Sequence, residues 1–195
     1  TVTGAGSRLL AERLASPLTD PDAIAGRLDA VGFLLDAEAL RTDLRAQLSG
    51  VPDMPRALSR LALDRGGPRD LGALREGLAT AGAVARDLDR TTDPLPAEIA
   101  AVRDALARLP AKLLADLDRC LADELPVHLR DGGFVRRDVD ADLDEARTLR
   151  DESRRVIATL QATYAEETGI KTLKIKHNAV LGWFVEVTAL HADRL

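Results

Sequence analysis

The sequence predicts a mainly α-helical protein, in which a helical core bundle is followed by a long helix that ends in a small β-hairpin. Three observations favour this fold. Ala, Leu, Arg and Asp dominate the 195 residues and aromatic residues make up only 3%, a composition that favours helices over sheets. Leucines recur at spacings of three and four residues through most of the chain. An alternating pattern is confined to the stretch TLKIKHNAVLGWFVEV, residues 172–187.

The first part of the chain reads as a series of short helices separated by Pro and Gly. Pro17 stops the first helix, and Asp20 with Pro21 supplies an N-cap and a first helical residue for the second. Pro68 opens a further helix, which ends before a loop at 91–96. The helices are expected before Pro17, from Pro21 to about 35, at 37–48, at 55–63, from 68, at 97–108 and at 112–123.

A break in the helical rhythm precedes one long helix. Residues 125–137 contain Asp131-Gly132-Gly133, which indicates a small hairpin or a kinked loop. Residues 138–167 then read as a single helix closed by Thr168-Gly169, roughly 40–45 Å long at 1.5 Å per residue. We therefore expect a helical core at 1–137, the long helix at 138–168 and a β-rich segment at 169–195.

The predicted hairpin carries three of the four lysines in the chain. Lys174 and Lys176 alternate with Leu173 and Ile175, which places the two lysines on one face of a strand. Together with Asn178 at the bend, they present donors that suit phosphate oxygens and read no bases. Lysines on an edge strand also protect it against aggregation, and the spacing alone leaves both interpretations open.

Charge and motifs exclude several function classes. A net charge of −5 argues against a protein that wraps nucleic acid over its whole surface, although residues 170–195 carry four basic and two acidic residues. Cys120, the one cysteine, stands in an acidic helical setting that favours a buried small side chain over a nucleophile. The three histidines are spread over different segments, so no catalytic or metal site is expected. No phosphate-binding loop and no apolar run of 18 residues is present, so neither nucleotide binding nor a membrane span is expected.

Several stretches in order resemble one family. TGIKTLKIKHNAVLGWFVEVT resembles the start of the clamp domain of the MutS family, bacterial ATPases that recognise DNA mismatches. GSRLLAERLASPLTDPDAIAGRLDAV and LDRGGPRDLGALREGL resemble its helical core, and HLRDGGFV…DADLDEARTL resembles the turn leading into its lever helix. The resemblance covers essentially the whole chain. It departs from the family pattern at Arg13, at Val139 and at Trp183-Phe184, where aromatic residues or a Tyr pair are common.

The resemblance implies a fragment made of the core, the outgoing lever and the first part of the clamp. The mismatch-reading domain would precede Thr1, and the ATPase domain that binds ATP and Mg would follow Leu195, so this fragment is expected to have no catalysis and no cofactor of its own. The parent protein would be a DNA-dependent ATPase that acts in the cytoplasm, at the nucleoid, as a homodimer. Its partners would be mismatched double-stranded DNA and other mismatch repair proteins. No interaction with a membrane is implied. Because the family's clamp contacts the DNA backbone, Lys174, Lys176 and Asn178 become the expected DNA-binding residues.

Two other readings of the residues remain. A freestanding helical module would use the 138–167 stripe as a coiled coil, and a helical enzyme would use an acidic site. The open reading frame on both sides would separate them, since a Walker motif downstream is expected only for the MutS-like fragment.

Overall fold

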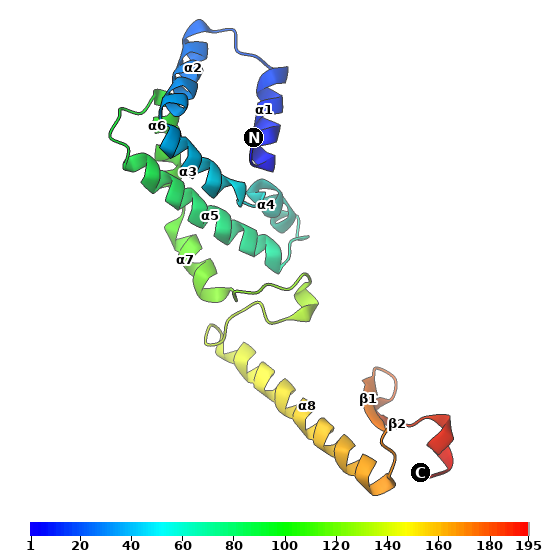
Figure 1. Cartoon of the computed structure of the whole chain (residues 1–195). Helices are drawn as coiled ribbons and strands as arrows, with labels where there is room; N and C mark the ends of the chain where they lie inside the picture. The colour runs from blue at the N-terminus through cyan, green and yellow to red at the C-terminus, as the bar shows by residue number, and fades with distance from the viewer. Residues whose placement is uncertain (195) are drawn as a thin grey trace. The chain divides into compact units, whose positions relative to one another are not determined.

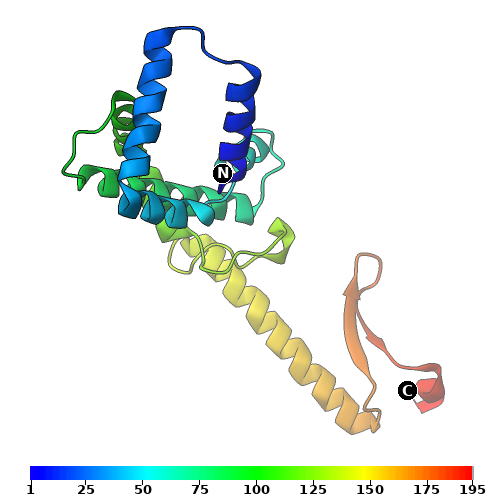
Figure 2. The ribbon, with the colours of Figure 1, turned by 45° about the horizontal axis from the view of Figure 1, so that its top comes forward.

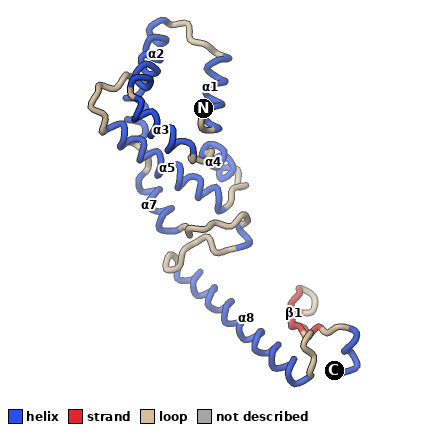
Figure 3. The backbone as a smooth tube through the Cα atoms, in the orientation of Figure 1, coloured by secondary structure: helices blue, strands red, loops and turns tan. Residues whose placement is uncertain are grey.

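The computed structural model describes residues 1–194 and confirms the mainly α-helical class. Helices occupy most of the described chain, and the strands of its one regular sheet lie near the C-terminal end (Figures 1 and 3). The chain divides into two compact units, Thr1–Arg136 and a second that begins at Arg137. Each unit is described by itself.

The first unit contains seven α-helices, whose ends follow the Pro, Gly and capping residues of the sequence. Thr3 begins the first helix by accepting a 2.9 Å hydrogen bond from the Gly6 N–H, and Asp20 accepts from the Asp22 N–H at 3.3 Å. The helices are α1 (Gly4–Ala15), α2 (Pro21–Asp36), α3 (Glu38–Ser49), α4 (Met54–Ala62), α5 (Pro68–Asp89), α6 (Ala97–Ala107) and α7 (Ala111–Cys120).

The core of this unit forms around α5, which packs against α3, α4, α6 and α7. Figure 2 shows α5 running across the unit with the other helices arranged around it. The buried side chains at these contacts are small or aliphatic and include Ala57, Val84, Leu88 and Leu117. Removing such side chains from water stabilises the unit at roughly 25 cal/mol per Å² of apolar surface.

A buried carboxylate fixes the start of α5. Asp70 is 9% exposed and accepts a 3.0 Å hydrogen bond from the Gly67 N–H at the N-cap position. Its other oxygen accepts from the Arg60 guanidinium, with a 2.9 Å bond from Nε. These partners, the Arg60 side chain first, hold the pKa of the Asp70 carboxyl below its ordinary value. Since Arg60 lies on α4, the carboxylate connects the end of one helix to the beginning of the next.

The Asp-Gly-Gly segment forms a kinked loop closed by one isolated bridge, between Leu121 and Val135. A short 3₁₀ helix, Leu129–Asp131, precedes Gly132 and Gly133, which both adopt positive φ. Arg136 secures the loop by donating from its guanidinium to the Leu121 carbonyl at 2.6 Å and to the Asp123 carboxylate at 2.7 Å.

The second unit consists of one long helix, a hairpin and a final 3₁₀ helix. The long helix α8 (Ala141–Thr168) begins at Asp140, which accepts from the Leu143 N–H at 2.9 Å, and 28 residues make it about 42 Å long. Strands β1 (Lys174–Asn178) and β2 (Gly182–Glu186) form the antiparallel hairpin, and the 3₁₀ helix spans Ala189–Arg194.

A sharp reversal separates α8 from β1. Gly169 ends the helix in the left-handed region, with φ of 69°. The next four residues form a turn closed by a 3.1 Å bond from the Leu173 N–H to the Ile170 carbonyl. Ile170 is fully buried and Leu173 is 2% exposed, so both ends of the turn are anchored in the packing of this unit.

Replacing Asp70 by Ala is expected to lower the free energy of unfolding of the 195-residue chain by about 2 kcal/mol. The change removes a buried acceptor, so the Gly67 N–H and the Arg60 guanidinium both lose a hydrogen bond. The loss should depend on pH. Since the folded-state pKa is depressed, the stabilisation is complete above the unfolded pKa of about 4 and disappears as the pH falls through the folded-state value. Urea unfolding at pH 7 and below pH 4 measures both effects. Asp104→Ala, which removes a surface pair with Arg103, should cost at most about 0.5 kcal/mol.

Replacing Gly169 by Ala is expected to destabilise the chain by about 1 kcal/mol through backbone strain alone, since a Cβ there meets no atom within 4 Å. Gly26→Ala is the matched control. It lies inside α2 with equally open space and ordinary φ, so Ala should stabilise by about 0.5–1 kcal/mol. Equal signs for the two changes in thermal unfolding would contradict this account.

Candidate nucleic-acid interface

The hairpin register places the predicted DNA-binding residues on one face. Directly paired residues in an antiparallel ladder point to the same side, and successive residues alternate. Lys174, Lys176 and Asn178 therefore share a face, with Glu186 and Phe184 from the opposite strand. The paired positions are Lys174 with Glu186, Ile175 with Val185, Lys176 with Phe184, His177 with Trp183 and Asn178 with Gly182.

Two of the three predicted residues already have partners on this face. The Lys176 ammonium forms an ion pair with the Glu186 carboxylate at 2.5 Å, across the diagonal of the ladder. The Asn178 side-chain oxygen accepts hydrogen bonds from the N–H groups of Val180 (3.0 Å) and Leu181 (2.7 Å) and so closes the turn. Thus Asn178 shapes the bend, while Lys176 is partly neutralised.

Sequence reasoning did not identify Glu186 as part of this face. It is the one acidic residue between Glu167 and Asp193. Its position opposite Lys174 depends on the turn being centred at Val180, which the alternation of β-type residues does not by itself specify. Locating the turn from the Asn178 side chain would have supplied that register.

The hairpin lies beside α8 at strand β1, and Trp183 on its opposite face reaches toward that helix. The Ile175 N–H donates to the Gln161 side-chain oxygen at 3.0 Å. Trp183 lies edge-on to His177, with ring centroids 5.1 Å apart. It also lines a depression of about 390 Å³ with residues of α8: Leu149, Glu152, Ser153, Val156 and Ile157. Trp183 and Val185 on this face remain 56% and 42% exposed, so the contact with α8 is partial.

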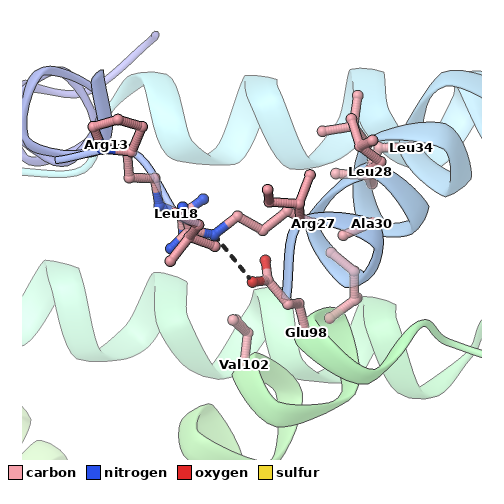
Figure 4. A pocket seen from close by; sticks show the side chains of 12 residues that line it. Arg13, Leu18, Arg27, Leu28, Ala30, Leu34, Glu98 and Val102 are labelled. Atoms are coloured by element: carbon pink, nitrogen blue, oxygen red, sulfur yellow. Dashed lines mark ion pairs between the residues drawn. The ribbon is translucent and has the colours of Figure 1, made fainter. Parts of the chain in front are cut away.

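A second concavity, of about 630 Å³, lies in the first unit between α2, α6 and the end of α1 (Figure 4). Its lining is largely aliphatic, including Leu28, Leu34 and Val102. Its ionisable groups are Arg13, Arg27 and Glu98, and the last two point toward each other with 3.5 Å between Nε and Oε1. One ion pair in an apolar wall offers no nucleophile or acid–base pair, so this groove does not compete with the hairpin as a site of chemistry.

The described residues contain no group of three or more His, Cys, Asp or Glu side chains that could hold a metal ion. No helix among them is both long and apolar enough to cross a lipid bilayer. Within residues 1–194 we therefore take the lysine face of the hairpin as the candidate site, because its ammonium groups suit an anionic ligand.

Comparison with known proteins identifies the family of this chain. The family model of MutS domain III matches residues 1–177. A curated relative, the DNA mismatch repair protein MutS of Rhizobium meliloti (strain 1021), is 60% identical over 195 residues, which are all of this chain and 21% of the relative. The fold and these matches define a segment of a mismatch repair protein. The chain belongs to the MutS family, and the resemblance of its motifs is confirmed.

The family match and the site overlap only in part. Lys174 and Lys176 fall inside the residues matched by the domain III model, whereas Asn178 and Glu186 lie beyond residue 177. The Rhizobium relative aligns over all four positions, because its match covers the entire chain. The chain spans about a fifth of the length of this relative.

Replacing Gln161 by Ala is expected to loosen the hairpin from α8, because the Ile175 N–H loses its acceptor. Trp183 is the only tryptophan, so its fluorescence reports this contact without a label. Acrylamide should quench Trp183 more strongly in Gln161→Ala than in the unchanged chain. Gln47→Ala in α3 removes the only other glutamine and should leave quenching unaltered. Identical quenching in all three proteins would contradict a docking role for Gln161.

Proposed function

We propose that this segment connects a DNA-contacting hairpin to a helical core within a MutS-family mismatch repair protein. In this proposal residues 1–137 form the core, 138–168 the lever, and 169–195 the start of the clamp. The observation that carries it is the placement of Lys174 and Lys176 on one face of a hairpin that lies beside α8 and is joined to it through Gln161. A long helix suits the transmission of a rigid-body movement between two ends of a protein.

The proposed contact is with the phosphate backbone of duplex DNA. Lysine supplies a charged donor without the fixed geometry that base recognition uses. The hairpin face has few charges, and the chain outside residues 170–195 has 23 basic and 30 acidic residues. The contact is therefore weak and independent of base sequence, and it adds to DNA binding elsewhere in the protein.

The remaining assignments follow from family membership. The full-length protein acts as a homodimer on mismatched double-stranded DNA with other mismatch repair proteins, in the cytoplasm at the nucleoid. The curated relative is named a DNA mismatch repair protein, which supports this role. Hydrolysis of ATP with Mg belongs to another part of the protein, and this segment contributes no catalytic residue.

The test is the double change Lys174→Glu with Lys176→Glu in the full-length protein that contains this segment. Affinity should fall by similar factors for matched and mismatched duplexes, because phosphates carry no base identity. The slope of log K against log salt should become shallower by about 1 to 2. Fluorescence anisotropy with labelled duplexes over a salt series measures both quantities.

Lys112→Glu is the matched control, since Lys112 is the one lysine outside the hairpin segment and is exposed on α7. It should leave affinity and salt slope nearly unchanged. Selective loss of mismatch preference in the double variant, or no change at all, would contradict the proposal. Protection of an edge strand would then be the better account of the lysines.

A further inference from the structure

A depression lies at the base of the hairpin, next to the lysine face. It encloses about 590 Å³ and is lined by Lys171, Thr172, Lys174, Glu186, Val187 and Thr188. The turn after α8 contributes two of these residues, each hairpin strand contributes one, and the segment after β2 contributes the last two. Sequence reasoning did not single out Lys171 or either threonine as a site residue.

The turn that carries Lys171 and Thr172 is held at both ends. Ile170 and Leu173 are buried, and the Leu173 N–H donates to the Ile170 carbonyl at 3.1 Å. Lys171 and Thr172 occupy the two central positions of this turn, and both are exposed. Their backbone is therefore set before any ligand arrives, which lowers the entropic cost of binding.

The donors around the depression suit one phosphate group. Lys171 and Lys174 supply two ammonium groups, and Thr172 and Thr188 supply two hydroxyls. Ammonium groups bind phosphate as point charges, and hydroxyls donate to the remaining oxygens. Among the described residues that line the depression there is no aromatic side chain, so these residues offer no stacking surface for a base.

Glu186 determines which lysines are available. It lies directly opposite Lys174 and forms its ion pair with Lys176. Because Lys176 already neutralises this carboxylate, Lys171 and Lys174 hold the charge that an incoming phosphate meets. The lysines at 171, 174 and 176 and the single carboxylate of Glu186 together carry a net charge of +2 at neutral pH.

We infer that this depression is the position at which the hairpin binds a DNA backbone phosphate, through Lys171 and Lys174, with Glu186 as a built-in counter-charge that lowers the affinity. The inference rests on the proposed DNA contact and refines it. Lys176 serves to neutralise Glu186, and Asn178 serves to shape the turn.

Two double variants with the same net charge test this assignment. Lys176→Gln with Glu186→Gln removes the ion pair and leaves the depression with both of its lysines. Lys174→Gln with Glu186→Gln also removes one positive and one negative charge but takes a lysine from the depression. Duplex affinity and salt slope are measured in the full-length protein with a labelled 30-base-pair duplex, about the length that spans three helical turns.

The first double variant should bind DNA as the unchanged protein does. The second should bind several-fold more weakly, with a slope shallower by about 1. Lys171→Gln should resemble the second variant, and Glu186→Gln alone should bind more tightly than the unchanged protein. All four substitutions lie on exposed side chains, and thermal unfolding checks that each protein folds.

The outcomes separate this inference from the proposed function. If the first double variant loses affinity and the second does not, the phosphate is bound by Lys176 and the inference is overturned. If both doubles bind alike, net charge alone governs binding and the depression is not a site. If Lys174→Glu with Lys176→Glu also has no effect, the proposed DNA contact itself fails.

Lysine footprinting gives a measurement that needs no variant. On binding the duplex, Lys171 and Lys174 should become protected from an amine-acetylating reagent, and Lys112 should not. A parallel sample with sodium phosphate at equal ionic strength distinguishes the source of the ligand. Protection by inorganic phosphate equal to that by DNA would assign the depression to free phosphate and overturn the DNA assignment.

Discussion

The Asp70 carboxylate accepts hydrogen bonds from the Gly67 N–H and from the Arg60 guanidinium, and so ties the start of α5 to α4. A carboxylate at the first turn also complements the positive end of the helix dipole. Because α3, α4, α6 and α7 all pack on α5, the direction in which α5 starts decides where its buried face lies. Two glycines of α5, Gly72 and Gly77, then let neighbouring side chains approach the α5 backbone closely. A Cβ at Gly77 would collide with Met54 of α4, and one at Gly72 would collide with Leu125.

The second unit depends on a comparable local constraint. Gly169 turns the chain out of α8 with positive φ, and buried Ile170 and Leu173 fix the turn that follows. The hairpin consequently runs beside α8, with Gln161 and the apolar side of the helix next to Ile175 and Trp183. This contact supports a two-stranded ribbon that would be marginally stable alone in water.

The electrostatics of the hairpin suit a contact that forms and releases easily. Three lysines and one glutamate lie within a few residues of each other, in a chain whose overall charge is −5. Interactions between exposed charges are modest and are screened by salt. Under the proposed function, a protein that contacts DNA at several places gains from such weak contacts, because their free energies add while each remains reversible. In the proposed contact, the acid opposite Lys174 would keep this contribution small.

The sequence by itself determined the elements of this protein and the order in which they occur. Helix periodicity, the caps at Asp20 and Asp140, and the glycine at 169 are local signals that act over a few residues. The alternation at 173–176 likewise placed Lys174 and Lys176 on one face before the partner strand was known. Only the tertiary structure decided which residues meet across longer separations. Strand register decides that Glu186 pairs with Lys176. Register and the reversal after α8 together decide that Lys171 and Lys174 line one depression and that Gln161 bonds to Ile175. A shift of one residue in that register would exchange the faces of the hairpin, and the alternation of β-type residues alone does not fix it.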